Sequence, residues 1–200
     1  MASTAAYYGL KPITDAGGSI RGKLQAVTLT TNSATGFFAG DLVNVGAGVA
    51  TPVTATPTTT RNGNTPWGIF VGAEWTDASG NPQYTNFFPA AGYTAYSSYG
   101  TITLFVANDP DIQFQVRADG PVAYTDIGKN APLGNFSAGN TATGNSAVNL
   151  VSGSINTTNT LGVKIIDIAP GPGNAAGDAY TDVICIWNQN VHAFRNILGV

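Results

Sequence analysis

Hydrophobic and polar residues alternate over short stretches along most of the chain, and glycine, proline or asparagine separates the stretches. The clearest case is 112–119, where every second residue is apolar. Alternation with period two predicts a strand with one buried and one exposed face. Residues 101–107 predict a more buried strand. The turn residues at 108–111 therefore predict a hairpin between the two.

Further stretches have the same character, whereas helix formers are sparse and Gly or Pro interrupts almost every ten residues. The most apolar, 163–168 and 183–187, are expected at the centre of a sheet, joined by the glycine-rich loop that contains 170–174. The pattern predicts an all-β fold with a single compact β-barrel or β-sandwich body. The two most apolar segments belong to expected strands at 161–168 and 182–187, and the other expected strands are 23–30, 41–45, 49–54, 67–75, 83–88 and 147–151.

Three regions lack a strand period and divide the chain into parts. Residues 1–22 are small and glycine-rich and predict an extended N-terminal arm, while 23–190 would form the body. Within the body, 134–160 is rich in Gly, Asn, Ser and Thr and predicts a long loop excursion. The chain becomes apolar again in 191–200, which predicts a C-terminal docking tail.

Few side chains suited to catalysis are present. Only 10% of the 200 residues are charged, against ~25% in typical soluble domains, and the chain has one histidine, one cysteine and one glutamate. General acid–base and nucleophilic catalysis use such groups in proximity. We therefore expect no enzyme activity, no catalytic residues, no cofactor and no bound metal.

Two local patterns have a chemical alternative. Cys185 lies among apolar residues and is expected to be a buried hydrophobe, although Cys185 and His192 could form a nucleophile pair. Asp109 with Asp111, or Asp178 with Asp182, could donate oxygens to Ca²⁺, but their spacing is more typical of turns. Residues 171–177 do not have the spacing of a nucleotide-binding loop and predict a hairpin loop.

The charge distribution argues against two kinds of partner. The formal net charge is −3, and the eight basic residues are scattered singly. Without a basic stripe, direct nucleic-acid binding is not expected. No apolar run approaches the ~20 residues of a membrane helix, and the N-terminus does not resemble a signal peptide. We expect no membrane association.

Aromatic residues cluster in 84–99. Tyr93, Tyr96 and Tyr99 recur at a spacing of three, beside Phe87 and Phe88. Core packing or a subunit interface is the simpler explanation, because tyrosine is enriched at interfaces. An aromatic surface for sugars is the alternative, which would make the chain a phage fibre or host-attachment module that binds surface glycans.

Several stretches together resemble the head decoration, or cement, proteins of tailed bacteriophages. The resemblance is diffuse, covers most of the chain, and implies an all-β body bound outside an icosahedral shell, usually as a trimer or dimer. It implies no catalytic residues. The stretches are AAYYGLKPI at 5–13, WGIFVGAE at 67–74, FVANDP at 105–110, ADGPVA at 118–123, DIGKNA at 126–131 and WNQNVH at 187–192.

The resemblance implies a virion protein on the outer capsid surface that staples neighbouring major capsid subunits against the pressure of the packaged genome. Its partners would be the major capsid protein and other copies of itself, as a homotrimer or a dimer. Apolar residues in an arm gain free energy only when a partner surface buries them. The expected contact residues are therefore Tyr7, Tyr8, Leu10 and Ile13 in the arm, and Phe194, Ile197, Leu198 and Val200 in the tail.

Overall fold

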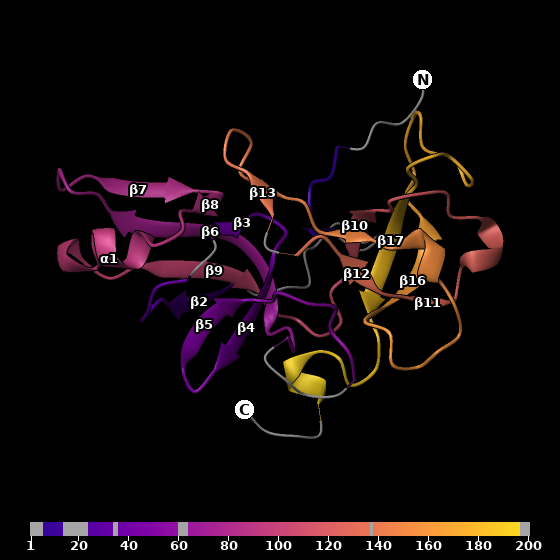
Figure 1. The fold of residues 1–200 in the computed structure, drawn as a ribbon, viewed down its shortest axis with the longest axis horizontal. Helices are drawn as coiled ribbons and strands as arrows, with labels where there is room; N and C mark the ends of the chain where they lie inside the picture. Colours follow the sequence, from indigo (N-terminus) through magenta and orange to yellow (C-terminus); the bar gives the residue numbers. More distant parts are fainter. Residues whose placement is uncertain (1–5, 14–23, 34–35, 60–63, 137, 197–200) are drawn as a thin grey trace.

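The structure, a computed structural model, describes residues 6–13, 24–33, 36–59, 64–136 and 138–196. It is an all-β fold with several antiparallel sheets and one short α-helix in this part of the chain, as the sequence pattern predicted. The sheets do not close into a barrel over the described residues. Figure 1 shows them arranged as two lobes side by side.

One sheet has five strands in the order β1 (Lys11–Pro12), β10 (Phe114–Arg117), β17 (Asp182–Trp187), β16 (Val163–Ile168) and β11 (Asn130–Ala131). β16 and β17 pair antiparallel near its centre, as predicted, and 171–177 lies in the loop between them. Two small strand pairs and three 3₁₀ turns complete the chain: β12 (Leu133–Gly134) with β15 (Asn149–Leu150), β13 (Gly139–Asn140) with β14 (Asn145–Ser146), η2 (Tyr124–Asp126), η3 (Ser152–Ser154) and η4 (Ala193–Arg195). β14 also contacts the other lobe, built from residues 24–107, through a bridge between Asn145 and Ala39, and η4 does so through Ala193 and Phe194.

The second sheet has six strands. Its order is β2 (Leu24–Thr28), β9 (Thr103–Ala107), β6 (Gly68–Thr76), β4 (Leu42–Gly46) and β5 (Val49–Pro52), and β7 (Pro82–Thr85) pairs with the far end of β6. Three short elements pack beside it: the pair β3 (Phe37–Phe38) and β8 (Phe87–Phe88), the helix α1 (Gly92–Tyr96), and η1 (Ser97–Tyr99).

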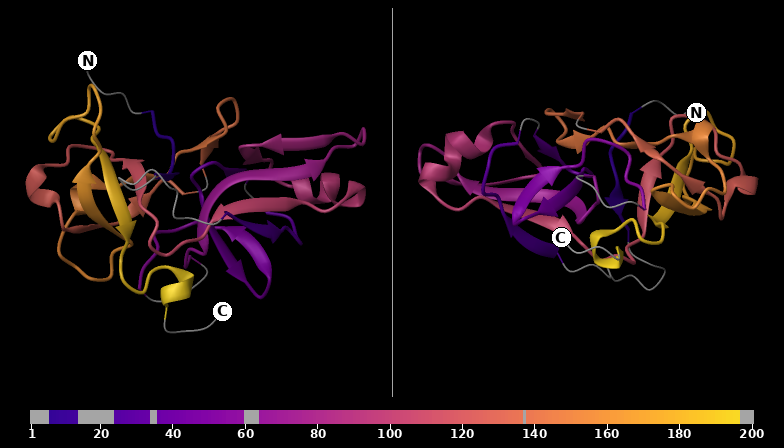
Figure 2. Two further views of the ribbon diagram at one scale, coloured as in Figure 1. Left: turned by 180° about the vertical axis from the view of Figure 1, so that it is seen from behind. Right: turned by 60° about the horizontal axis from the view of Figure 1, so that its bottom comes forward.

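The chain passes between the lobes twice. The first lobe is built from residues 24–107, and the second from 6–13 and 112–187. Figure 2 shows the same division from behind and from below. The predicted hairpin of 101–107 with 112–119 is wrong, because β9 and β10 belong to different sheets. Each already has two neighbours, β2 and β6 for β9, and β1 and β17 for β10, so the turn at 108–111 crosses between lobes.

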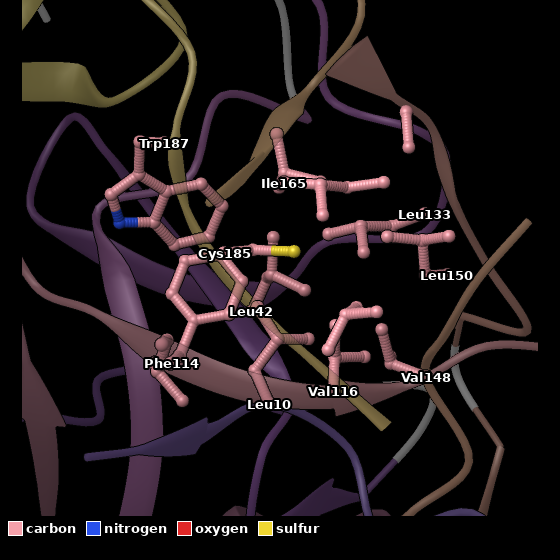
Figure 3. Packing of buried hydrophobic residues seen from close by; sticks show 14 of the residues in the cluster. Leu10, Leu42, Phe114, Val116, Leu133, Val148, Leu150, Ile165, Cys185 and Trp187 are labelled. Carbon is pink, nitrogen blue, oxygen red and sulfur yellow. The ribbon is translucent and has the colours of Figure 1, made fainter. Parts of the chain in front are cut away.

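Two hydrophobic clusters fill the interior, and the larger one spans both lobes. Leu42, Ile69 and Ala107 come from the first lobe but pack with residues of the second, among them Phe114 and Trp187. Figure 3 shows this cluster around Cys185. The smaller cluster lies within the first lobe, between its sheet, β3, β8 and α1. The two sheets therefore share buried surface, and the lobes are not independent cores.

The N-terminal segment is part of the body, which corrects the predicted arm for residues 6–13. β1 pairs with β10, and Leu10 lies in the large cluster with 1% of its surface exposed. The Leu10 N–H donates to the Gly40 carbonyl at 3.0 Å, and the Ile13 N–H donates to the Gln113 carbonyl at 3.0 Å. Residues 1–5 and 14–22 of the predicted arm lie outside the described residues.

A charged contact fixes this segment. Arg117 forms two hydrogen bonds to Asp182, from Nε at 2.7 Å and from one terminal nitrogen at 2.8 Å. Its other terminal nitrogen donates to the Ala6 carbonyl at 3.0 Å, and its guanidinium lies 5.4 Å from the centre of the Tyr8 ring. Such a bidentate pair is among the stronger polar contacts in proteins. It holds the segment preceding β1 against β10 and β17.

The other two predicted appendages also pack on the body. The excursion at 134–160 contains strands, and its Val148 and Leu150 are buried in the large cluster. In the tail, Val191 and His192 are buried, and the Ala193 N–H donates to the Pro66 carbonyl at 2.9 Å. The tail thus docks, over 191–196, on its own chain. The apolar residues of these two segments are therefore buried against other parts of the same chain.

We predict that Leu10→Ala lowers the free energy of unfolding by about 2–5 kcal/mol, the range for truncating a fully buried leucine. Deleting residues 1–13 should destabilise the protein at least as much, because β10 loses β1, one of its two neighbours, and the core loses Leu10. Urea unfolding followed by circular dichroism measures both effects. Tyr124→Ala, at a side chain that is 70% exposed, is the control and should leave the midpoint unchanged. An unchanged midpoint after the deletion would contradict the role of β1.

Candidate functional site

One face of the six-stranded sheet is covered by the smaller cluster, and the other is open except where Ile69 and Ala107 pack in the larger cluster. Val27, Leu104 and Val106 point into the smaller cluster. Residues opposite one another in an antiparallel ladder share a face, and the register therefore places a second set on the other side. We call this set the outer face: Leu24, Ala26, Thr28, Gly72, Glu74, Tyr84, Thr103 and Phe105.

The outer face exposes apolar surface and carries little charge. Tyr84 is 66% exposed and Leu24 is 46% exposed. The Tyr84 ring lies 5.7 Å from the Phe105 ring, between centroids, and beside Gly72, where an added Cβ would be 3.5 Å from the Tyr84 hydroxyl. Glu74 is the one charged side chain of the set. Exposed apolar surface with tyrosine and few charges is typical of protein–protein contact sites.

A groove of about 660 Å³ opens where the outer face meets the second lobe. It is mainly apolar, with a few polar groups at Tyr8, Lys11, Gln115 and Asn145. Residues 14–23, which connect Ile13 to the Leu24 side of the groove, lie outside the described residues. We call this feature the interlobe groove; its apolar wall consists of Leu10, Pro12, Leu24, Phe70, Val71 and Ala107.

The outer face and the interlobe groove form the candidate site, and their chemistry suits binding. The apolar wall of the groove offers a surface on which apolar groups of a ligand could be buried. The amides of Gln115 and Asn145 and the Lys11 amine supply a small number of hydrogen-bonding groups. Such a surface fits an extended or loop segment of another protein. The residues of this surface are held in hydrogen-bonded strands, so little backbone order has to be gained on binding.

The arm residues predicted as contacts lie close to this site but differ in exposure. Tyr8 and Leu10 line the groove. Leu10 is a core residue, which corrects its assignment as a partner contact, because its side chain is already buried by its own chain. Tyr7, Tyr8 and Ile13 are half-buried. Burial and the neighbouring Asp182 raise the pKa of the Tyr8 hydroxyl above its usual range.

Among the predicted tail residues, Phe194 is 50% exposed. Its ring contacts Trp67 edge-on at 4.6 Å between centroids and lies 5.3 Å from His192. Phe194 is therefore half of an aromatic pair on the surface and is available to a partner. Ile197, Leu198 and Val200 lie outside the described residues.

The three evenly spaced tyrosines, Tyr93, Tyr96 and Tyr99, do not form a single exposed row. Tyr93 and Tyr96 pack against the smaller cluster, and the Tyr96 ring lies 5.9 Å from Trp75 and 6.4 Å from Phe88. Core packing is thus confirmed for these two residues. Tyr99 is exposed, as its place at the end of η1 requires.

Cys185 and His192 are both buried. Cys185 lies on β17 between Phe114 and Ile165 of the neighbouring strands, and burial raises the pKa of its thiol above its usual range. The expectation of a buried hydrophobe is confirmed. The His192 Nδ1 accepts a hydrogen bond from the Phe194 N–H at 3.2 Å, and burial lowers its pKa to about 4. A thiol of raised pKa that solvent does not reach is a poor nucleophile.

The paired carboxylates serve turns and ion pairs. Asp109 accepts a hydrogen bond from the Asp111 N–H at 2.8 Å, and Asp111 pairs with Arg195. Asp178 accepts from the Ala175 N–H at 2.8 Å. Over the described ranges, no group of three or more His, Cys, Asp or Glu side chains is arranged to hold a metal ion. No helix in the same ranges is long and apolar enough to span a membrane.

Asp41 is a buried carboxylate at the junction of the lobes. Its Oδ2 accepts a hydrogen bond from the Phe38 N–H at 2.8 Å, and burial raises its pKa to about 6. The Asp41 N–H closes the turn before β4 by donating to the Phe38 carbonyl at 2.9 Å, and the Asp41 carbonyl accepts from the Phe70 N–H of β6 at 2.8 Å. Asp41 therefore stabilises the loop that contacts Leu10.

The sequence did not point to Leu24 or the open sheet face. The alternation in 23–30 places Leu24, Ala26 and Thr28 on one side of a strand, and a leucine among small and polar residues was the available signal. The pattern alone does not tell which face of a sheet is covered, because that depends on strands distant in the sequence.

Neither protein-family models, nor curated proteins, nor solved structures gave a match to this chain.

We predict that Cys185 resists alkylation in the native protein. Iodoacetamide should modify it only after denaturation, because the thiol is inaccessible and its raised pKa leaves little thiolate. Mass spectrometry of the intact protein, with and without urea, measures the modification. Rapid native labelling would contradict its burial and would revive the pairing of Cys185 with His192 as a nucleophile.

Two buried groups with shifted pKa values, His192 and Asp41, should affect stability in opposite directions as the pH falls. His192 is neutral in the fold but protonates in the unfolded chain below its ordinary pKa of 6.5, so its contribution is lost between pH 6.5 and pH 4. Asp41 is protonated in the fold below about pH 6 and ionised in the unfolded chain down to 3.8, so its contribution grows over that window.

We therefore predict that Asp41→Asn exposes the effect of His192. The variant should lose about 2–3 kcal/mol of stability between pH 6.5 and pH 4, at about 1.4 kcal/mol per pKa unit, while the wild type changes less. His192→Gln should show the opposite slope. Urea unfolding across this range measures both variants. Parallel pH profiles for Asp41→Asn and the wild type would show that Asp41 is ionised in the fold.

Proposed function

We propose that this chain is a non-enzymatic structural protein of a bacteriophage virion that binds the outer capsid surface and holds neighbouring major capsid subunits together. The observation that carries a binding role is the outer face with its groove, which exposes Tyr84 and Leu24 on a hydrogen-bonded sheet with a single charge among its residues. The phage assignment rests on the resemblance in sequence.

Burial of the apolar outer face against a partner would supply the binding free energy. Removing apolar surface from water contributes roughly 25 cal/mol per Å². Tyr84 and Phe105 form a preformed aromatic contact that loses little conformational freedom on binding. A surface with few charges also has a low desolvation cost. The outer face therefore suits a lasting contact with another protein surface.

A protein that bridges subunits stabilises only the closed shell, because its binding free energy is gained when both subunits are in place. Many copies then multiply a modest contact over the whole lattice. No catalytic group is required for this role.

The contact residues differ in part from those expected. Tyr84, Leu24 and Phe105 are the main contacts in this proposal, and Phe194 with its Trp67 neighbour is a second exposed aromatic surface. Tyr8 contributes as a lining residue of the groove, and Tyr7 and Ile13 contribute as half-buried neighbours in the same segment. Leu10 is left out because it is a core residue.

The glycan-binding alternative loses most of its support from the tyrosine run. Tyr93 and Tyr96 pack against the smaller cluster, which leaves Tyr84 and Tyr99 as the exposed tyrosines of 84–99. Saturable binding on a glycan array that depends on Tyr99 would nevertheless favour attachment over capsid stapling.

We predict that Tyr84→Ser weakens binding to capsids by roughly ten-fold or more, since a central aromatic contact contributes on the order of 1.4 kcal/mol or above. The measurement is re-addition of purified protein to shells stripped by mild heating, followed by sedimentation. Tyr124→Ser is the matched control, because Tyr124 is equally exposed but lies on the second lobe. It should bind as the wild type does.

Equal binding by the two variants would show that the outer face is not the contact. Recovery of the chain only in tail or soluble fractions, and never with shells, would contradict the proposed function itself. Unchanged circular dichroism of both variants confirms that the comparison concerns binding and not folding.

A further inference from the structure

β2 forms one edge of the six-stranded sheet, and half of its backbone groups point away from the sheet. The Leu29 N–H donates to the Ile102 carbonyl at 2.9 Å, in register with the β2–β9 ladder. Hydrogen-bonding residues alternate in an antiparallel ladder, so Gln25 and Val27 bond toward β9. The N–H and carbonyl groups of Leu24, Ala26 and Thr28 therefore face outward.

These outward groups have no strand beside them in the described part of the chain. The edge also lacks the features that block strand pairing. From Leu24 to Ser33 no residue is charged and none is proline. Natural sheets usually protect an edge of this kind with charge, proline, a bulge or a covering element.

The other sheet edges in the described residues do carry such protection. Pro12 lies in β1, Pro52 in β5 and Pro82 in β7. β11 is two residues long, and Asn130 is bridged by Asn156. Proline on an edge removes a donor and prevents another strand from pairing. β2 is thus the one unprotected edge of the two main sheets as described.

We propose that β2 is a self-association site, at which β2 of one copy pairs antiparallel with β2 of a second copy across a two-fold axis at Ala26. Ala26 then lies opposite Ala26 of the other copy, and Leu24 lies opposite Thr28. The two six-stranded sheets become one continuous sheet.

A second copy fits this edge because a two-fold interface must be self-complementary. The outward groups at Leu24, Ala26 and Thr28 are symmetric about Ala26, so each donor meets an acceptor. A neutral strand places no like charges opposite one another, and the small Ala26 side chain lies at the axis. Tyr84 is on β7, beyond β9 and β6, so this pairing leaves it free for another partner.

Cysteine cross-linking tests the register in purified protein. Cα atoms directly opposite in this ladder are about 5.5 Å apart, within the range of a disulfide. Ala26→Cys should form a covalent dimer on mild oxidation, with the buried Cys185 contributing no background. Leu24→Cys and Thr28→Cys should cross-link when mixed but much less separately, because like positions are then about 13 Å apart along the strands.

Sedimentation velocity over a range of concentrations tests the association without cross-links. The interface is small, so we expect dimers at high concentration that dissociate on dilution. Ala26→Lys should abolish them without affecting stability, since the side chain is exposed and two ammonium groups would face each other. The matched control is Ser79→Lys, in the exposed turn between β6 and β7, which should behave as wild type.

Three outcomes would overturn the proposal: a monomer at every concentration with no Ala26→Cys dimer, a dimer that persists in Ala26→Lys, or efficient cross-linking of Leu24→Cys by itself. None of these readouts depends on whether Tyr84 contacts a capsid.

Discussion

The backbone contact between Gly9 and Gly40 determines how the two sheets join. Both residues have positive φ, 74° and 90°, and a Cβ on Gly9 would lie 2.8 Å from the Gly40 Cα. Only glycine permits this approach. It lets the Leu10 N–H bond to Gly40 and places the Leu10 side chain among residues of both lobes. The groove, the buried Asp41 and the open sheet face all lie around this junction.

The local pattern was sufficient to predict the strands but not their partners. β16 and β17 were predicted correctly because they are the two most apolar segments of the chain, they are consecutive strands, and the glycine-rich loop between them forms no strand that could separate them. The hairpin of β9 with β10 was predicted on the same grounds and is wrong. Strand pairing depends on side-chain packing against neighbours that are distant in sequence, and no turn signal at 108–111 contains that information.

The candidate site was harder to predict for a related reason. Leu10 and Tyr84 are both apolar residues in short extended segments, and their sequence contexts are alike. Leu10 is buried because β10 and the Gly40 turn surround it. Tyr84 is exposed because, in the described residues, no other element covers the outer face of β7. Cys185 was placed correctly because its immediate neighbours on both sides are apolar. Burial was thus predictable where local context alone decides it.

The order of the strands along the chain has a consequence for synthesis. Lys11 of β1 pairs with Gln115 of β10, and residues 24–107, which form the first lobe, lie between these two strands in the sequence. The first lobe is therefore synthesised after β1 and before β10. During translation, the N-terminal segment leaves the ribosome with no β-partner and has to wait while residues 24–107 emerge. The first lobe can form its ladders in that interval, since β2 to β9 pair among themselves. Completion of the second sheet is then a late step that closes a long loop, at a cost that grows only with the logarithm of its length.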